Sequence, residues 1–393
     1  MPGSLRRLSC SLLLSIGLAA AAHAQGVPGV TKDTIKIGGF GPLTGPSYLY
    51  GKLALNGVEV LYDEINAAGG IHGRKLVLVR EDDKCNAEGA IGAVKKLIHQ
   101  EQVFMIHGGG CSNAAIAARD EIEKTGIPWV NIAAVADSVS APPAKNIYTT
   151  ATTASMESYA QLQFAIDKGA KKIGILSMRD AWGRQRYEPM LAAFKAKGVA
   201  IAADEEMTPD ANDATPQVLK LKAAGVDAVL MVLYPKPGAV FLRDAMKLAY
   251  KPIVVGQTAI ADPAAFEEQV GVPGGTANFF TISMVKYVPD DPAVEKWRKL
   301  VEAKFPGDRL STFNLFGIGS AKVVVEALKR AGPDLTRESF LKALGELENF
   351  DAEMFGAPIN CKTPDHRCNK APAWLKKEPG GPLKVLGVTK VAM

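Results

Sequence analysis

The chain has 393 residues, of which 47% are hydrophobic and 22% charged, and its formal net charge is +5. This length suits two domains of ordinary size, and the composition is that of a globular protein, which excludes a disordered chain. The positive charge is small and evenly spread, so the sequence does not predict a nucleic-acid-binding surface.

The first 24 residues have the layout of a secretory signal peptide. Two arginines precede the apolar run LLLSIGLAAAA, and the AHA that ends this region offers a cleavage site before Gln25. A short buried helix is the alternative, but nothing amphipathic follows the run. We therefore expect a signal peptide over 1–24, loss of Cys10 with it, and a periplasmic mature protein. No other run reaches the ~18 apolar residues of a membrane span.

Short β-rich runs then alternate with longer amphipathic runs. The first series predicts strands at 34–40, 75–82, 103–108 and 127–133, with intervening helices at 51–70, 87–100 and 113–125. Strands that alternate with helices of this length form βαβ units and a parallel sheet.

A second series follows Thr150. It predicts helices at 155–170, 183–198, 214–225 and 238–249, and strands at 172–178, 199–207, 227–234 and 252–256. The restart indicates two α/β lobes of similar topology. The helical stretches at 291–305, 311–332 and 336–347 lack strands of their own. We expect them to cover the sheet of the first lobe, which requires the chain to recross between lobes.

Four cysteines remain after export, at positions 85, 111, 361 and 368. An even number in an exported chain favours disulfides, with three possible pairings. Cys361 and Cys368 flank a Pro-Asp turn that can bring their sulfurs together, which leaves Cys85 to pair with Cys111. A zinc site that includes His366 is the alternative, but a fourth ligand is not near.

The sequence lacks the common signatures of catalysis. GFGPLTG does not have the glycine spacing of a dinucleotide site, HGGGCSN has no P-loop lysine, and no G-x-S-x-G occurs. The histidines at 72, 99, 107 and 366 form no ligand pair, and the acidic trio 81–83 has no second acidic cluster. We therefore expect no enzymatic activity, no cofactor and no metal.

Ligands of open α/β sheets bind at the carboxyl ends of the strands, where several loops gather. Among them, the glycine-rich turn before residue 113 would expose backbone N–H groups that favour a carboxylate, and Ser112 adds a hydroxyl donor. Trp182 and Tyr234 lie at such ends in the second lobe. Each is an aromatic contact for a ligand or, alternatively, an ordinary packed residue.

The stretch at 35–85 is similar to the opening of the periplasmic Leu/Ile/Val-binding proteins of ABC transporters. It contains GPLTG, a Tyr-Gly pair, INAAGGIHGRKL, and DD two residues before a cysteine. The resemblance implies a type I periplasmic binding fold, with two Rossmann-like lobes of parallel sheets joined by three hinge crossings. It implies a first lobe of 33–149 plus 283–355 and a second lobe of 150–282 plus 356–393. It also implies a disulfide between Cys85 and Cys111.

The resemblance further implies contacts for a ligand α-carboxylate and side chain. The matching positions are Tyr50, Ser112, Ala133, Ala134, Trp182 and Tyr234. Val135 stands where the family carries threonine, and Thr258 stands where it carries the acid that pairs the ligand ammonium. A buried ammonium without a counter-charge costs several kcal/mol.

The resemblance implies that the protein is the solute-binding component of an ABC importer. We expect it to be a monomer whose partner is an inner-membrane permease. Two ligand classes follow. One is a branched-chain or related amino acid captured by hinge closure, with Asp180 or Asp262 supplying the counter-charge. The other is a carboxylate or amide without an ammonium, including aromatic ones, with Arg179 or Lys236 meeting extra negative charge. A ligand-sensing module of a receptor is the alternative function.

Overall fold

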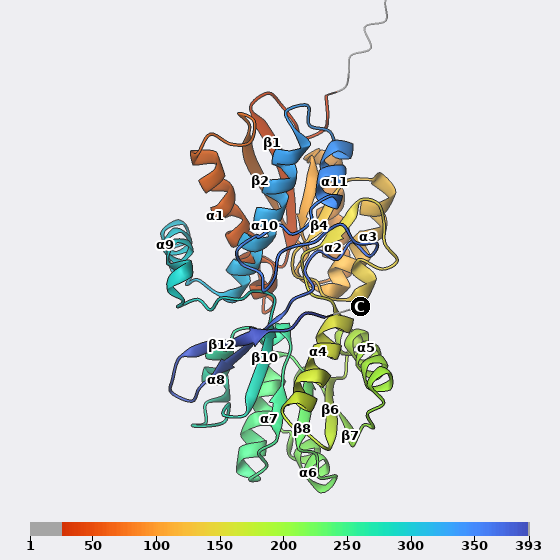
Figure 1. The fold of residues 1–393 in the computed structure, drawn as a ribbon, viewed down its shortest axis with the longest axis vertical. Helices are drawn as coiled ribbons and strands as arrows, with labels where there is room; N and C mark the ends of the chain where they lie inside the picture. Colours follow the sequence, from red (N-terminus) through yellow and green to blue (C-terminus); the bar gives the residue numbers. More distant parts are fainter. Residues whose placement is uncertain (1–25, 392–393) are drawn as a thin grey trace, which may run out of the picture.

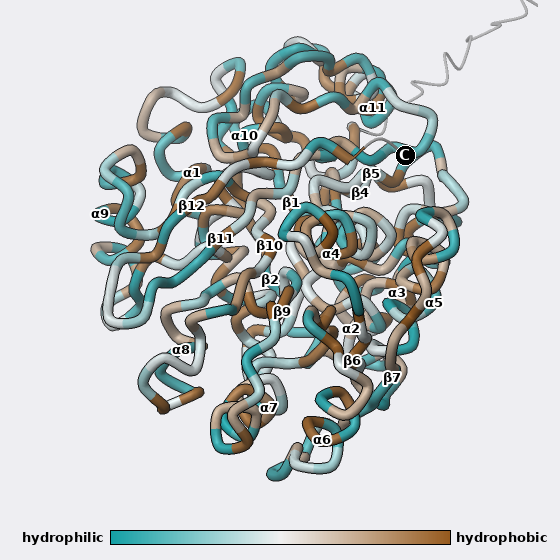
Figure 2. Tube along the Cα trace, turned by 60° about the horizontal axis from the view of Figure 1, so that its bottom comes forward, coloured by the Kyte–Doolittle hydropathy of each residue, from teal (hydrophilic) through white to brown (hydrophobic). Residues whose placement is uncertain are grey.

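A computed structural model describes residues 26–391, which form two α/β lobes joined at a narrow waist (Figure 1). The prediction of two lobes is confirmed, whereas the predicted signal peptide at 1–24 lies outside the described residues. Hydrophobic and hydrophilic stretches alternate along the helices, as expected of helices that bury one face (Figure 2). None of the described helices is long and apolar enough to cross a membrane.

The first lobe contains a parallel sheet with the strand order β2-β1-β3-β4-β5. Its strands are β1 (Thr34–Gly41), β2 (Lys75–Asp82), β3 (Met105–Gly108), β4 (Trp129–Asn131) and β5 (Ile147–Thr149). All four residues of β3 and all three of β4 are buried, because helices cover both faces of the sheet. Such strands read as continuous apolar runs in the sequence.

The helices of this lobe come from both ends of the chain. They are α1 (Lys52–Ala67), α2 (Ala87–Lys95), α3 (Ser112–Thr125), α9 (Glu295–Lys304), α10 (Thr312–Ala331) and α11 (Arg337–Gly345). Helix α10 packs closely on α1, since a Cβ at Gly57 would lie 2.0 Å from the Asn314 oxygen and one at Gly317 would lie 1.9 Å from the Ala54 oxygen. The late helical segment therefore covers the first lobe, as expected.

The second lobe has a seven-stranded sheet in the order β12-β11-β10-β9-β8-β6-β7. Its strands are β6 (Ile173–Met178), β7 (Ala203–Met207), β8 (Ala228–Val232), β9 (Ile253–Val255), β10 (Phe279–Ser283), β11 (Ala373–Lys377) and β12 (Leu383–Val388). Its helices are α4 (Ala154–Asp167), α5 (Ala181–Lys197), α6 (Thr215–Ala223), α7 (Pro235–Lys247) and α8 (Pro263–Val270). Strand β11 pairs antiparallel with β10 and with β12, so the sheet ends in an antiparallel hairpin that the sequence analysis did not anticipate.

The chain crosses between the lobes after β5, after β10 and before β11 (Figure 1). The third crossing differs in position from the implied boundary at 355/356. Ile359, Cys361 and Cys368 belong to the core of the first lobe, so the crossing follows them and precedes β11.

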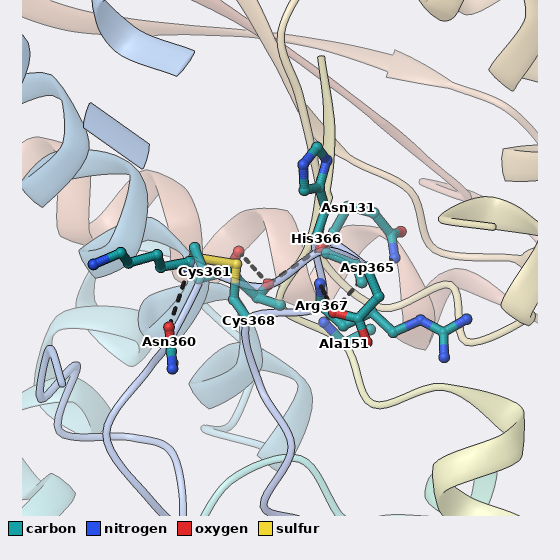
Figure 3. Close-up of a disulfide and its surroundings, with 12 residues drawn as sticks. Asn131, Ala151, Asn360, Cys361, Asp365, His366, Arg367 and Cys368 are labelled. Atoms are coloured by element: carbon teal, nitrogen blue, oxygen red, sulfur yellow. Dashed lines mark hydrogen bonds between the residues drawn. A yellow bond between two sulfur atoms is a disulfide. The ribbon is translucent and has the colours of Figure 1, made fainter. Parts of the chain in front are cut away.

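The disulfide between Cys361 and Cys368 closes a short loop beside the first crossing (Figure 3). The N–H of Thr149 donates to the carbonyl oxygen of His366 at 3.0 Å, and the N–H of Cys368 donates to the carbonyl oxygen of Thr149 at 2.8 Å. The loop thus extends the pairing of β5 at the point where the chain leaves the first lobe. The predicted pairing of these two cysteines is confirmed.

An ion pair strengthens the same place. Arg367 lies 3.0 Å from Asp137 of the first lobe, and Asp137 accepts hydrogen bonds from the backbone N–H (3.0 Å) and hydroxyl (2.6 Å) of Ser155 at the start of α4. The disulfide loop is therefore connected through one carboxylate to the first helix of the second lobe.

Replacing both Cys361 and Cys368 by serine should lower the free energy of unfolding by about 2 kcal/mol, because the unfolded chain is no longer restricted by the cross-link. Guanidinium unfolding followed by circular dichroism measures this. The double serine variant of Cys85 and Cys111, whose loop spans 26 positions rather than 7, should lose more. An unchanged midpoint and slope in the first variant would contradict the structural role of the loop.

Candidate functional site

A cavity of about 160 Å³ lies between the lobes, and both lobes contribute to its walls. Six of the seven contact residues expected from the sequence line it, namely Tyr50, Ser112, Ala133, Trp182, Tyr234 and Thr258. The seventh, Ala134, is buried beneath the wall and is not among the lining residues. Residues expected to converge from distant parts of the chain are therefore brought to one place.

The first-lobe wall is built on the turn that leads from β3 into α3. Gly109 has φ of +107°, a backbone conformation that glycine tolerates, and a Cβ at Gly110 would lie 2.8 Å from the carbonyl oxygen of Tyr50. The disulfide between Cys85 and Cys111 holds this turn to the loop after β2, with Cα atoms 5.4 Å apart. This pairing was predicted and is confirmed.

Internal hydrogen bonds decide which backbone donors of this wall face the cavity. The N–H groups of Ala133 and Ala134 both donate to the carbonyl oxygen of Gly109, at 3.0 and 3.1 Å. Among the described residues, the N–H of Val135 has no hydrogen-bond acceptor, and Val135 lines the cavity. The donors implied at the two alanines are thus occupied, and within the 133–136 loop the N–H of Val135 is the one without an acceptor among the described residues.

Ser112 is the side-chain donor of the same wall. Its Oγ accepts a hydrogen bond from the N–H of Ala136 at 3.2 Å, so one lone pair is occupied and the hydroxyl proton remains free to donate. Ser112 is also the first residue of α3, where the N–H groups of the first turn have no partners inside the helix. Together with Val135, this creates a group of donors suited to an anionic oxygen.

The second-lobe wall is aromatic and cationic. Asp180 accepts a hydrogen bond from the N–H of Gly183 at 2.8 Å and so caps α5, which places Trp182 in its first turn. The ring of Trp182 stacks on that of Tyr234 with centroids 4.4 Å apart. The guanidinium of Arg186 lies 4.3 Å from the centroid of the Trp182 ring.

Arg186 is only 4% exposed and lines the cavity. Its Nε donates to Oε1 of Gln257 at 2.5 Å, and its Nη2 lies 3.9 Å from Oε2 of Glu157. Its Nη1 has no hydrogen-bond partner in the described part of the chain. Burial lowers the pKa of Arg186, an effect that Glu157 opposes, but a guanidinium in a protein stays charged.

Glu157 is the buried partner of this cation. Its Oε1 accepts hydrogen bonds from the hydroxyls of Thr152 (2.8 Å) and Thr258 (2.6 Å), while Oε2 has no hydrogen-bond donor among the described residues. Burial raises the pKa of Glu157, and Arg186 opposes that rise. The hydroxyl proton of Thr258 is thus directed at Glu157 and away from the cavity.

The four charged residues considered for extra contacts lie elsewhere. Asp180 and Asp262 cap α5 and α8, and Arg179 pairs with Glu206 on the surface at 3.1 Å. Lys236 is exposed. None of the four is among the lining residues.

Sequence reasoning missed the residue with the most unusual environment. Arg186 follows Trp182 by one helical turn, so the two share a face of α5, and this spacing was a usable signal. Phe313 and Phe316, at the start of α10, also line the cavity. Their place could not be inferred locally, because it depends on the return of α10 to the first lobe.

His107, at the end of β3, has a structural environment. Its Nδ1 lies 2.9 Å from the hydroxyl of Tyr62 and its Nε2 lies 2.8 Å from the hydroxyl of Ser320. Burial lowers the pKa of His107 to about 3, so the imidazole is neutral at physiological pH. The described residues contain no cluster of three or more His, Cys, Asp or Glu side chains placed to hold a metal ion.

With this architecture established, comparison with known proteins identifies its family. Residues 34–377 match the family of periplasmic binding proteins, and the chain belongs to that family. Leu/Ile/Val-binding protein homolog 7 of Brucella abortus is 28% identical over 330 residues, which cover 80% of this chain and 82% of the relative.

Two solved structures share the fold. The fatty acid ABC transporter substrate-binding protein from Thermomonospora curvata superposes with a TM-score of 0.78 at 24% identity, over 93% of this chain and 94% of its own. The branched-chain amino acid transporter protein LivJ from Streptococcus pneumoniae, in complex with isoleucine, superposes with a TM-score of 0.75 at 21% identity, over 90% and 99%. The fold is therefore that of type I binding proteins, and it accompanies more than one kind of ligand.

A buried acid near the cavity should make stability depend on pH. Burial raises the pKa of Asp83 to about 6, above its value in an unfolded chain, so its ionisation between about pH 4 and 6 destabilises the folded protein. Between pH 4 and pH 7, wild type should lose about 2 kcal/mol of unfolding free energy relative to Asp83→Asn. Denaturant unfolding at each pH measures the difference.

Asp82→Asn provides the contrast, because hydrogen bonds from Leu43, Thr44 and Lys84 lower the pKa of Asp82 despite its partial burial. The unfolding free energy of the wild type relative to that of Asp82→Asn should rise with pH. Parallel pH profiles of the unfolding free energy for wild type and Asp83→Asn would contradict the raised pKa of Asp83.

Proposed function

We propose that this protein is the extracytoplasmic solute-binding component of an ABC importer and that its ligand is a small carboxylate without an ammonium group. The observation that carries the proposal is the buried, incompletely paired Arg186 in the cavity wall. The family and the interlobe position of the cavity support the binding role.

The charges around the cavity favour an anion over a zwitterion. None of the described residues that line the cavity is acidic, and Arg186 is the charged one. Glu157 stands behind Thr258 but already faces Arg186, so the pair carries no net negative charge for an ammonium. An ammonium group moved from water into this site would find no free negative charge to offset its desolvation, which costs several kcal/mol.

The first-lobe wall is the natural site for the carboxylate. Ser112 Oγ and the N–H of Val135 are free donors, and the N-terminus of α3 adds a partial positive charge. The absence of the family's threonine at Val135 removes a hydroxyl and leaves the backbone donor unchanged.

The size and lining of the cavity suit a ligand about as large as one aromatic ring. An apolar protein cavity of about 150 Å³ accommodates benzene, which is close to the 160 Å³ found here. Aromatic rings of both lobes line it, and they offer flat apolar faces for stacking. The aromatic contributors are Tyr50, Trp182, Tyr234, Phe313 and Phe316.

Capture would proceed by hinge closure. A ligand docks on the first-lobe wall, and the second lobe brings Trp182, Tyr234 and Arg186 over it, which excludes water. The hydroxyl of Tyr50 already reaches across the cleft to the carbonyl oxygen of Ala259 at 3.3 Å, which supports a closed arrangement. The closed form would then be recognised by a membrane permease.

Calorimetric titration of the purified protein against leucine, isoleucine, valine, and a series of aromatic and aliphatic carboxylates tests the ligand class. We expect micromolar or tighter binding of at least one carboxylate without an ammonium, and no measurable binding of the amino acids. Tight binding of leucine with every such carboxylate silent would overturn the proposed class.

Ser112→Ala should weaken carboxylate binding roughly tenfold, because one hydrogen bond to a charged group is lost. Ser138→Ala is the matched control, since Ser138 lies in the neighbouring 137–139 turn with its side chain exposed. Equal dissociation constants for Ser112→Ala and wild type would remove Ser112 from the site.

A further inference from the structure

The two charges of the second-lobe wall differ in their access to the cavity. Arg186 lines the cavity, whereas Glu157 is only 2% exposed and is not among the lining residues. The carboxylate of Glu157 therefore lies behind the wall, where a ligand does not touch it. Because buried charges are screened much less than exposed ones, its negative charge still acts on a ligand through the protein interior.

The contacts of Glu157 favour its ionised form. Its Oε1 accepts hydrogen bonds from the hydroxyls of Thr152 and Thr258, and its Oε2 lies 3.9 Å from Nη2 of Arg186. These contacts oppose the rise in pKa that burial causes, and the guanidinium beside the acid stays charged in a protein. The pair therefore places one positive and one negative charge in the same wall.

The other acidic groups near this wall have partners or positions elsewhere. Asp137 forms an ion pair with Arg367 at 3.0 Å, and Asp180 caps α5. Neither acid is among the residues that line the cavity. Glu157 is therefore the acid that opposes the positive charge of Arg186 at the cavity wall.

We propose that Glu157 is a specificity-determining residue that restricts the ligand to a single negative charge. By offsetting the charge of Arg186 from behind the wall, Glu157 leaves no full counter-charge for a second carboxylate. The ligand class is therefore a monocarboxylate, and dicarboxylates of the same size are excluded. This inference rests on the proposed function and adds to it the net charge of the ligand.

Ligands with one and with two carboxylates make different demands on the two walls. The hydroxyl of Ser112 and the N–H of Val135 in the first lobe receive one carboxylate without any net charge of their own. A second carboxylate would face the second-lobe wall, where attraction to Arg186 is opposed by repulsion from Glu157. Removal of a carboxylate from water is costly unless a counter-charge offsets it, so the dicarboxylate should bind more weakly.

Pairs of acids that match in size but differ by one charge test the proposal by calorimetry. The probes are pentanoate with glutarate, which have equal numbers of carbon atoms, and 4-nitrobenzoate with terephthalate. A nitro group has the shape of a carboxylate without its net charge. For wild type we expect each monocarboxylate to bind at least about tenfold more tightly than the dicarboxylate of its pair.

Glu157→Gln assigns this preference to the buried charge, because it removes the charge and keeps an oxygen for the two threonine hydroxyls. We expect glutarate and terephthalate to bind the variant at least about tenfold more tightly than wild type, since Arg186 is no longer opposed. Both monocarboxylates should gain less, because their charge lies at the first-lobe wall. A purely structural role of Glu157 would instead weaken the binding of all four probes.

Glu206→Gln is the matched control. Glu206 lies in the same lobe and pairs with Arg179 on the surface at 3.1 Å, and neither residue lines the cavity. The same change of acid to amide, made outside the cavity, should keep the wild-type ratio of affinities within each pair of probes.

The outcomes separate this inference from the proposed function. Equal or tighter binding of the dicarboxylates by wild type, or an unchanged ratio in Glu157→Gln, overturns the inference but leaves the carboxylate-binding function intact. Silence of all four probes with both proteins also overturns it, because the variant should accept a dicarboxylate. Binding of leucine with every monocarboxylate silent overturns the proposed function itself. Should Glu157→Gln fail to fold in a thermal melt, the wild-type ratios remain able to overturn the inference.

Discussion

The buried contact between Arg186 and Glu157 organises the second-lobe wall of the cleft. Two opposite charges have been taken out of water without a direct hydrogen bond between them, at a separation of 3.9 Å. Desolvation of both ions is costly, and hydrogen bonds from surrounding groups offset only part of that cost. Thr152 and Thr258 donate hydrogen bonds to Glu157, and Gln257 accepts one from Arg186.

The first-lobe wall is organised by a different constraint, the saturation of backbone donors. In the 133–136 loop, Gly109 accepts hydrogen bonds from two successive N–H groups and Ser112 accepts from a third, so the N–H of Val135 is the one in that loop without an acceptor among the described residues. The disulfide at Cys111 fixes the turn that makes these bonds. One wall therefore offers neutral donors and a helix N-terminus, while the other offers a cation, and both are suited to oxygen acceptors.

Much of the architecture was predictable from local sequence. The alternation of apolar runs with amphipathic ones predicts the two lobes, because a parallel sheet requires helical crossovers. The paired cysteines were anticipated from their number and spacing, and the resemblance to the Leu/Ile/Val-binding proteins implied most of the residues that are found to line the cavity. The position of the third crossing was not, because residues 356–368 join the first lobe by extending the pairing of β5, a contact between distant segments.

The sequence by itself determined the α/β class of the fold, because the periodicity of apolar residues is a local property. The disulfide pairs and the residues of the cleft were predicted with the help of elimination and of the resemblance to a known family. Only the tertiary structure decided the chemistry of the cavity. From the sequence alone, Arg186 would be taken for a surface charge on α5. In the structure it contacts Gln257 and Glu157, which belong to other segments. Thr258 was expected to contact the ligand, whereas in the structure its hydroxyl donates to Glu157. Hydrogen bonding between residues about 30 to 100 positions apart decides both, and no local pattern encodes such contacts.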